Sequence, residues 1–212
     1  SLIAFVESYR KFTHIPTPQP SLFYVNKFAE RLTRLARHHN NYPNITIRID
    51  VEPEDLIVYA DENLITQVVL NLLKNAMQAI GHEQENGLIL FKAYCDPNEA
   101  VILEVTNNGP IIPPEEAEHI FVPFFTTKEG GSGIGLSISR QIMRLSGGSI
   151  ALRSNPAQRQ TTFVLTFPRP GRYADTQARI HGRDPMGTPA YPYSYPSVSE
   201  YLHLCIRAAT SL

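Results

Sequence analysis

The chain has 212 residues, of which 42% are hydrophobic and 18% charged, and its formal net charge is −1. This length and composition are enough for one domain with a buried core, and they exclude an intrinsically disordered chain. Because nucleic acids and anionic membranes attract chains with an excess of lysine and arginine, we expect neither as a direct partner.

The two cysteines, Cys95 and Cys205, lie far apart and outside any C-x-x-C pattern. They predict neither a disulfide framework nor a zinc site, and they favour a cytoplasmic setting. The sequence has no apolar run of about 18 residues and no signal segment, so we expect no membrane-spanning helix. We expect the chain to be the cytoplasmic part of a larger protein, which could be anchored in a membrane upstream of Ser1.

Helices and strands are expected in alternation along the first half of the chain. Apolar spacing predicts a helix near the start, with residues 1–15 as the helix end and the proline-rich residues 16–20 as a stiff linker. Spacing by three and four residues predicts an amphipathic helix over 21–37. Alternating isoleucines over 45–51 and an apolar run over 56–59 predict two strands.

A long helix is expected from Asp61, a favourable N-cap residue, to about Ile80. Further predictions are strands over 88–94 and 101–105, a short helix from Pro113, a helix ending at Gly147 and Gly148, and strands over 149–153 and 161–167. Because several strands follow one another directly, the sheet is expected to be mixed.

One face of the helix expected after Asp61 carries polar residues at spacings of three and four: Gln67, Asn71, Lys74, Asn75 and Gln78. Such a stripe is most often a solvated face. Here apolar residues crowd both sides, which predicts a narrow, half-buried stripe where unpaired amides are costly unless they meet a ligand or ion. Asparagine carbonyl oxygens suit Mg²⁺ shared with substrate phosphates.

Residues 121–136 run from an aromatic cluster through a glycine-rich loop into a helix. Glycines let backbone amides approach a polyphosphate, the helix N-terminus adds a positive dipole end, and Lys128 supplies a charge. A flexible loop without a ligand is the alternative interpretation. The segment is neither a P-loop nor a dinucleotide fingerprint, because the spacing of both motifs is absent.

In order and spacing, four segments resemble the boxes of the ATP-binding catalytic domain of two-component sensor histidine kinases, which has the Bergerat (GHKL) fold. Asn71–Ala79 resembles the N box, Asn107–Ile111 the G1 box, Phe121–Phe124 the F box and Gly131–Leu136 the G2 box. The resemblance covers about residues 1–170. It implies an α+β fold, a two-layer α/β sandwich whose mixed sheet is covered on one face by helices, with residues 21–170 as the ATP-binding domain.

The resemblance also implies roles for individual residues. Asn75 would ligate Mg²⁺, Asn71, Lys74 and Asn75 would form the catalytic set, and a short mobile lid would span 121–131. The residues implied to contact ATP are Asn71, Lys74, Asn75, Asn107, Gly109, Ile112, Phe121, Phe124, Thr127, Lys128, Gly131, Ser132, Gly133, Ile134, Gly135, Leu136 and Thr161.

The activity implied is transfer of the γ-phosphoryl group to a histidine on the dimerisation and phosphoacceptor domain of the same kinase. The phosphate would then pass to the receiver domain of a response regulator, and the full-length protein would be a homodimer. The first helix resembles the end of the dimerisation domain's second helix. Hydrolysing relatives carry a glutamate base where this chain has Asn71, and an amide cannot take a proton from water, so transfer is favoured over hydrolysis.

The G1 segment departs from the family pattern, because Asn107 stands in place of an aspartate and Ile111 in place of a glycine. Asn107 loses the charge, so we expect weaker adenine binding and reduced discrimination against guanine. Ile111 disfavours positive φ, so its loop is expected to run differently from the family's.

None of the seven histidines fits the family's phosphoacceptor pattern, so the chain is interpreted as a catalytic fragment that lacks this histidine. The alternatives are a pseudokinase or nucleotide-binding scaffold with a degenerate G1 box, and a serine/threonine kinase of the same fold that regulates a transcription factor. The proline- and tyrosine-rich residues 171–212 are interpreted as a flexible or adventitious tail, with a partner-binding tail as the alternative.

Overall fold

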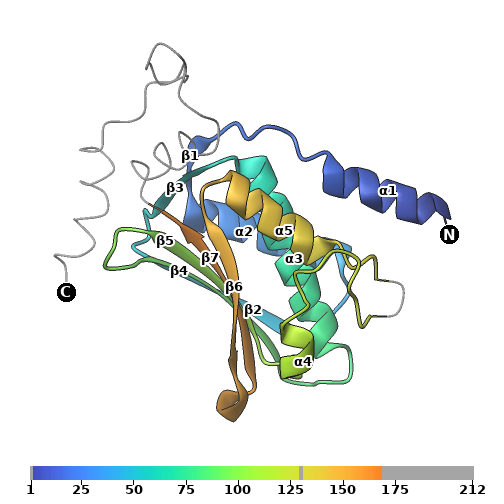
Figure 1. Cartoon of the computed structure of the whole chain (residues 1–212). Coiled ribbons are helices and arrows are strands. Elements are labelled where there is room, and N and C mark those ends of the chain that lie inside the picture. The colour runs from blue at the N-terminus through green and yellow to red at the C-terminus, as the bar shows by residue number, and fades with distance from the viewer. Residues whose placement is uncertain (1, 129–130, 169–212) are drawn as a thin grey trace.

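The computed structural model describes residues 2–128 and 131–168 (Figure 1). Its elements in chain order are α1 (Leu2–Thr13), β1 (Ser21–Tyr24), α2 (Val25–His39), β2 (Ile45–Glu52), β3 (Ile57–Ala60), α3 (Glu62–Ile80), β4 (Gly87–Cys95), β5 (Val101–Asn107), α4 (Pro114–Ala117), α5 (Gly135–Leu145), β6 (Ser149–Asn155), the 3₁₀ turn η1 (Pro156–Gln158) and β7 (Gln160–Phe167).

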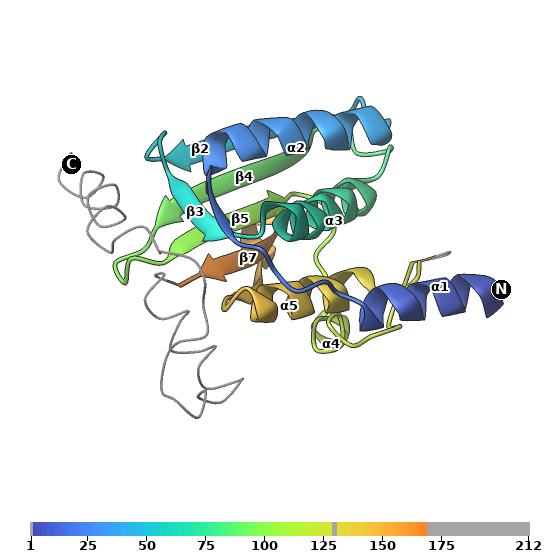
Figure 2. The same cartoon turned by 90° about the horizontal axis from the view of Figure 1, so that it is seen from above.

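Five strands form one sheet in the order β2-β4-β5-β7-β6, while β1 and β3 pair separately. β2 and β4 are parallel and the other neighbours in the large sheet are antiparallel, so the sheet is mixed, as the sequence predicts. Helices α2, α3 and α5 lie side by side on one face of this sheet (Figure 2). The expected two-layer α/β sandwich is therefore confirmed.

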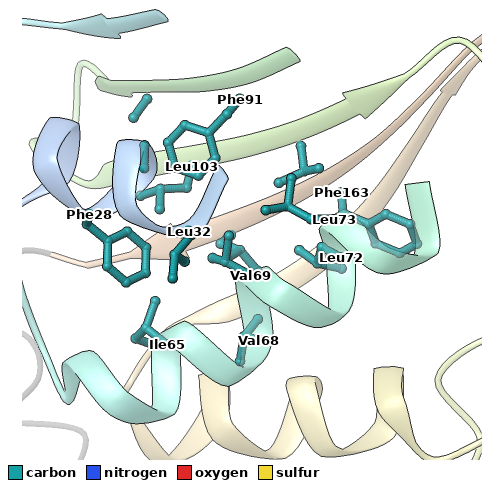
Figure 3. Packing of buried hydrophobic residues seen from close by; sticks show 14 of the residues in the cluster. Phe28, Leu32, Ile65, Val68, Val69, Leu72, Leu73, Phe91, Leu103 and Phe163 are labelled. Carbon is teal, nitrogen blue, oxygen red and sulfur yellow. The ribbon is translucent and has the colours of Figure 1, made fainter. Parts of the chain in front are cut away.

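The core lies between the helices and the sheet. Alternate residues of β4, such as Phe91, turn toward the helices, and α3 contributes buried residues along most of its length. Figure 3 shows Phe91 and Leu103 of the sheet facing Val69 and Leu73 of α3. Because the apolar side of α3 is anchored in this core over the central strands β4 and β5, its polar side is held in a fixed position.

The prediction of a helix over 21–37 is wrong at its start. Residues 21–24 form β1, which pairs antiparallel with β3 from Ser21↔Ala60 to Tyr24↔Ile57, and the helix runs from Val25 to His39. Within β1, Phe23 is buried while Leu22 and Tyr24 are exposed, which is the alternation of a strand. Apolar spacing in one segment does not reveal a strand partner more than thirty residues away, so the helix pattern was extended too far.

The other predicted elements are present with ends that differ by a few residues. The first helix ends at Thr13, and the boundaries drawn at residues 15, 20 and 170 stay predictions. The tail expected over 171–212 lies outside the described residues. Among the helices of residues 2–128 and 131–168, none is both long enough and apolar enough to cross a membrane.

Candidate functional site

A cavity of about 410 Å³ opens between α3, α5, the carboxyl end of β5 and the segment that follows α4. Thirteen of the residues predicted to contact a nucleotide line it, namely Asn71, Lys74, Asn75, Asn107, Ile112, Thr127, Lys128, Gly131, Ser132, Gly133, Gly135, Leu136 and Thr161. The segments that carry them are separated by up to ninety residues of sequence. The fold therefore brings the N, G1 and G2 segments to one place.

The polar stripe of α3 forms one wall of this cavity. Asp61 fixes the start of the helix, since its Oδ1 accepts hydrogen bonds from the backbone N–H groups of Asn63 and Leu64 at 3.0 and 3.1 Å. Three turns later Asn71 and Asn75 are half-buried and line the cavity, whereas Gln67 is exposed and does not. The expected half-buried stripe is thus confirmed for its asparagines.

Asn71 is tied to the first turn of α5. Its Nδ2 donates to the Ser139 hydroxyl at 3.4 Å, and that hydroxyl donates to the Gly135 carbonyl at 2.9 Å. A Cβ at Gly135 would overlap the Asn71 side-chain amide, so glycine at this position lets Asn71 keep its present orientation. No side chain caps the start of α5, which leaves its first-turn N–H groups facing the cavity side without a side-chain acceptor.

Lys128 reaches back from the loop to α3. Its Nζ donates to Asn75 Oδ1 at 3.2 Å and to Gln78 Oε1 at 2.9 Å. Burial lowers the pKa of the Lys128 ammonium, and the nearby charge of Lys74 lowers it further. The cavity thus brings two cationic side chains close enough to repel each other, and binding of an anion would relieve this repulsion.

The opposite end of the cavity is formed by β5 and β7, where Asn107 and Thr161 are register partners. Asn107 is 4% exposed, and its Oδ1 accepts a hydrogen bond from the backbone N–H of Gly109 at 3.0 Å. Thr161 is 2% exposed, and its Oγ1 is buried without a hydrogen-bond partner. An orphaned hydroxyl in a cavity wall fits a ligand that supplies the missing bond.

Four predicted residues do not line the cavity: Gly109, Phe121, Phe124 and Ile134. Phe121 packs edge-on against Phe163 with ring centroids 6.4 Å apart, and Ile134 is buried just before α5. Gly109 holds the turn that follows Asn107. Direct contact of these four residues with a ligand stays a prediction.

Phe124 adopts a left-handed backbone, with φ 65°, and its N–H donates to the carbonyl of Gly133 at 2.9 Å. This bond closes the base of the loop. Ile111 is not among the described non-glycine residues with positive φ, so its β-branched side chain causes no backbone strain. A path of this loop that differs from the family's stays a prediction.

The cavity also has lining residues that were not assigned as contacts from the sequence: Gln78, Ala79, Pro110, Glu116, Ile120, Phe125, Thr126 and Phe163. Gln78 continues the polar stripe, so its spacing was an available signal. Glu116 accepts a hydrogen bond from the Thr127 hydroxyl at 3.3 Å, which joins α4 to the loop. Of the others, Ala79 and Pro110 belong to the N and G1 segments, whereas Ile120, Phe125 and Thr126 follow α4 and Phe163 belongs to β7.

Comparison with known proteins places this site in a family. Residues 60–171 match the family model described as "Histidine kinase-, DNA gyrase B-, and HSP90-like ATPase". The sensor histidine kinase ZraS of Salmonella typhi is 41% identical over 118 residues, which are 56% of this chain and 24% of ZraS. The chain spans about a fifth to a quarter of the length of the first curated relatives it matches.

Two solved structures have the same arrangement. The catalytic domain of histidine kinase ThkA aligns with a TM-score of 0.63 and 36% identity, covering 71% of this chain and 95% of that domain. ThkA in complex with the response regulator protein TrrA aligns with a TM-score of 0.65 and 31% identity, covering 79% of this chain and 47% of the other.

Proposed function

Because the chain belongs to the family of histidine kinase-, DNA gyrase B- and HSP90-like ATPases, we propose that it transfers the γ-phosphoryl group of Mg·ATP to a histidine. Its fold and its relatives are those of ATP-binding catalytic domains of sensor histidine kinases. The observation that carries the proposal is the single cavity that collects the amides of α3, the loop lysine and the start of α5.

Magnesium would be held by Asn75, whose Oδ1 is a hard oxygen donor of the kind this ion prefers. The same oxygen already accepts a hydrogen bond from the Lys128 ammonium, so it faces a cationic partner. When bound, the ion supplies charge neutralisation for the phosphate oxygens. The residues present therefore fit the metal that the family implies.

The triphosphate would be held by Lys74, Lys128 and the backbone amides that begin at Gly131 and continue into α5. Such a set holds an anion locally, which is consistent with a chain whose formal net charge is −1. Asn71 would position the phosphates next to α5, to which its amide is hydrogen-bonded. It would not act as a general base, because an amide cannot take a proton from water. Positioning and charge stabilisation are the main contributions expected for phosphoryl transfer.

The acceptor histidine would belong to the dimerisation domain of the same kinase, in a full-length homodimer. Of the histidines in the described part of the chain, none lines the cavity. The phosphate would pass from that histidine to a response regulator receiver domain, a partner supported by the complex in which ThkA is solved with TrrA.

A nucleotide-binding scaffold without transfer is the second candidate. It is favoured by Asn107, whose acceptor oxygen is already used by Gly109 and carries no full charge. Weak nucleotide binding without turnover would be the result. The two candidates differ in whether phosphohistidine forms.

The test supplies γ-labelled ATP and Mg²⁺ to the chain together with a separately expressed dimerisation domain of a related sensor kinase. We expect acid-labile phosphohistidine with the wild type, its loss with Asn75→Ala, and its retention with Asn63→Ala. Asn63 is the matched control because it lies on the same helix, is exposed and does not line the cavity. Nucleotide binding without phosphohistidine would favour the scaffold, and phosphoserine or phosphothreonine would overturn both.

A further inference from the structure

At the end of the cavity formed by β5 and β7, where the purine base of a nucleotide would lie, the hydrogen-bonding groups select for an acceptor on the ligand. We infer that Asn107 lets the site accept 6-oxopurine nucleotides, those of guanine and hypoxanthine, as well as adenine nucleotides. This inference rests on the proposed function of the cavity as a nucleotide site. The inference names a specificity-determining residue and the class of ligand it admits.

The orientation of the Asn107 amide is fixed by its backbone neighbour. A backbone N–H can only donate, so the atom that faces Gly109 N at 3.0 Å has to be the carbonyl Oδ1. The Nδ2 group therefore points elsewhere, and no protein acceptor within the described residues is bonded to it. Because the residue lines the cavity, a donor amide is what remains for a ligand there.

Turning this amide over would be costly. Rotation by 180° would bring Nδ2 against the Gly109 N–H, which replaces a buried hydrogen bond by two facing donors. Losing such a bond in a buried position lowers the population of the turned form by about tenfold or more. The surroundings are also rigid, since a Cβ on Gly109 would meet the backbone of Ala79 at 2.9 Å and Asn107 is paired with both β4 and β7.

Thr161 does not impose the opposite preference. Its hydroxyl is buried, lines the same end of the cavity and has no partner, and a hydroxyl both donates and accepts. It can bond to an amino group in one orientation and to a carbonyl oxygen in the other. The direction of selection at this end therefore rests with Asn107.

The chemistry of the bases gives the consequence. Adenine carries an amino group at position 6, which is a donor, whereas guanine and hypoxanthine carry an oxygen there, which is an acceptor. The Asn107 Nδ2 group is a donor, so it cannot bond to the 6-amino group of adenine, but it can donate to the oxygen at position 6 of guanine or hypoxanthine. An aspartate at this position would reverse the preference, since a carboxylate accepts from the amino group and repels the oxygen.

The experiment compares equilibrium dissociation constants of ATP, GTP and ITP with Mg²⁺ for the wild type, Asn107→Asp and Asn75→Ala by titration calorimetry. ITP differs from ATP in the oxygen at position 6 and lacks the 2-amino group of guanine, so it isolates the contact. We expect ITP to bind the wild type within about threefold of ATP or more tightly, and Asn107→Asp to shift the ITP/ATP ratio toward ATP by about tenfold or more.

Asn75→Ala separates the inference from the proposed function. It should weaken all three nucleotides and leave their ratios unchanged, because it acts on the phosphate end. If the wild type prefers ATP as strongly as Asn107→Asp does, the inference is overturned while nucleotide binding stands. If no nucleotide binds the wild type at millimolar concentration, both fall.

Thermal unfolding of each variant shows whether it is folded. If Asn107→Asp does not fold, Thr161→Val supplies a second comparison, because it removes the hydroxyl and leaves Asn107 in place. We then expect ATP to lose more affinity than ITP, since adenine would keep only a donor opposite its amino group. Equal losses would overturn the inference.

Discussion

The Lys128 ammonium lies 3.2 Å from Asn75 Oδ1, the oxygen that we propose as the magnesium ligand. Because the ammonium and a metal ion would compete for this oxygen, we expect binding of Mg·ATP to break the hydrogen bond between Lys128 and Asn75. The Lys128 charge would then be available to the phosphates, together with that of the nearby Lys74. In this interpretation, Lys128 donates to the Asn75 oxygen in the free protein and would contact the nucleotide in the bound one.

Replacing Lys128 by methionine keeps much of the chain length and removes the charge. We expect Lys128→Met to weaken Mg·ATP binding by about tenfold, the magnitude of one charge-assisted contact. Adenosine binding should stay unchanged, because the lysine acts on the phosphates. Lys92→Met is the control, since Lys92 lies over the Tyr94 ring at 5.5 Å, away from the cavity. An equal loss for adenosine would show that Lys128 shapes the pocket instead.

Gly135→Ala should separate ligand binding from stability. Alanine favours the helix by up to about 1 kcal/mol, but its Cβ would overlap the Asn71 amide and force that side chain to rotate. The displaced atoms are the end of a side chain, so we expect the free energy of unfolding to change by less than about 1 kcal/mol. Nucleotide affinity should fall at least about fivefold if Asn71 positions the phosphates.

A double-mutant cycle tests this route. If Gly135→Ala acts through Asn71, adding it to Asn71→Ala costs no further affinity. Additive losses measured by calorimetry would mean that the new methyl group blocks the cavity directly.

The sequence was sufficient for elements whose signal is local. Asp61 as N-cap followed by a long apolar periodicity predicts α3, and the structure has Asp61 as the N-cap of a helix that ends at Ile80. β1 was missed because its defining partner, β3, lies more than thirty residues away. The apolar run that predicts β3 is local, but β1 carries no such mark that distinguishes it from the start of the following helix, and pairing with β3 decides its structure.

The site shows the same difference between residues that local sequence predicts and residues that only tertiary packing brings in. Asn71, Asn75 and Gly135 were predicted because the motifs contain them, and they do line the cavity. Phe125 belongs to the aromatic cluster and Phe163 to β7. Both were missed as lining residues because tertiary packing brings them to the cavity. The orphaned Thr161 hydroxyl and the bond that orients Asn107 are likewise properties of the folded backbone.

Asp61 should stabilise more than its own helix. Besides capping α3, its Oδ2 accepts a hydrogen bond from the Gln19 N–H at 2.8 Å, which fastens the linker to the domain. We expect Asp61→Ala to lower the free energy of unfolding by about 1–3 kcal/mol in urea titrations. Asp61→Asn keeps acceptor oxygen at the cap and should lose less than half of that. Equal losses for the two variants would contradict a capping role.

The environment of Tyr94 predicts that the free energy of unfolding changes at alkaline pH. Burial raises the pKa of its phenol, and the hydrogen bond that it donates to Glu104 at 3.0 Å raises it further. The folded state thus favours the protonated phenol, so its contribution is complete below the ordinary pKa near 10 and is lost as pH rises through the raised value. We expect the difference in unfolding free energy between wild type and Tyr94→Phe to shrink above pH 10. A difference that is constant from pH 8 to 11 would contradict this.

Glu104 is a buried carboxylate on the sheet face that points away from the helices. Its side chain is 8% exposed, and it accepts hydrogen bonds from Tyr94 and from Arg153, whose side chain is 59% exposed. Because removal of one partner leaves a buried charge less satisfied, we expect Arg153→Met to destabilise the fold by about 1–3 kcal/mol. The double variant with Glu104→Gln should recover most of this loss, since no buried charge then remains. Nucleotide affinity should be the same in all three proteins, because neither residue lines the cavity. A double variant less stable than Arg153→Met would show that the carboxylate is held by Tyr94 alone.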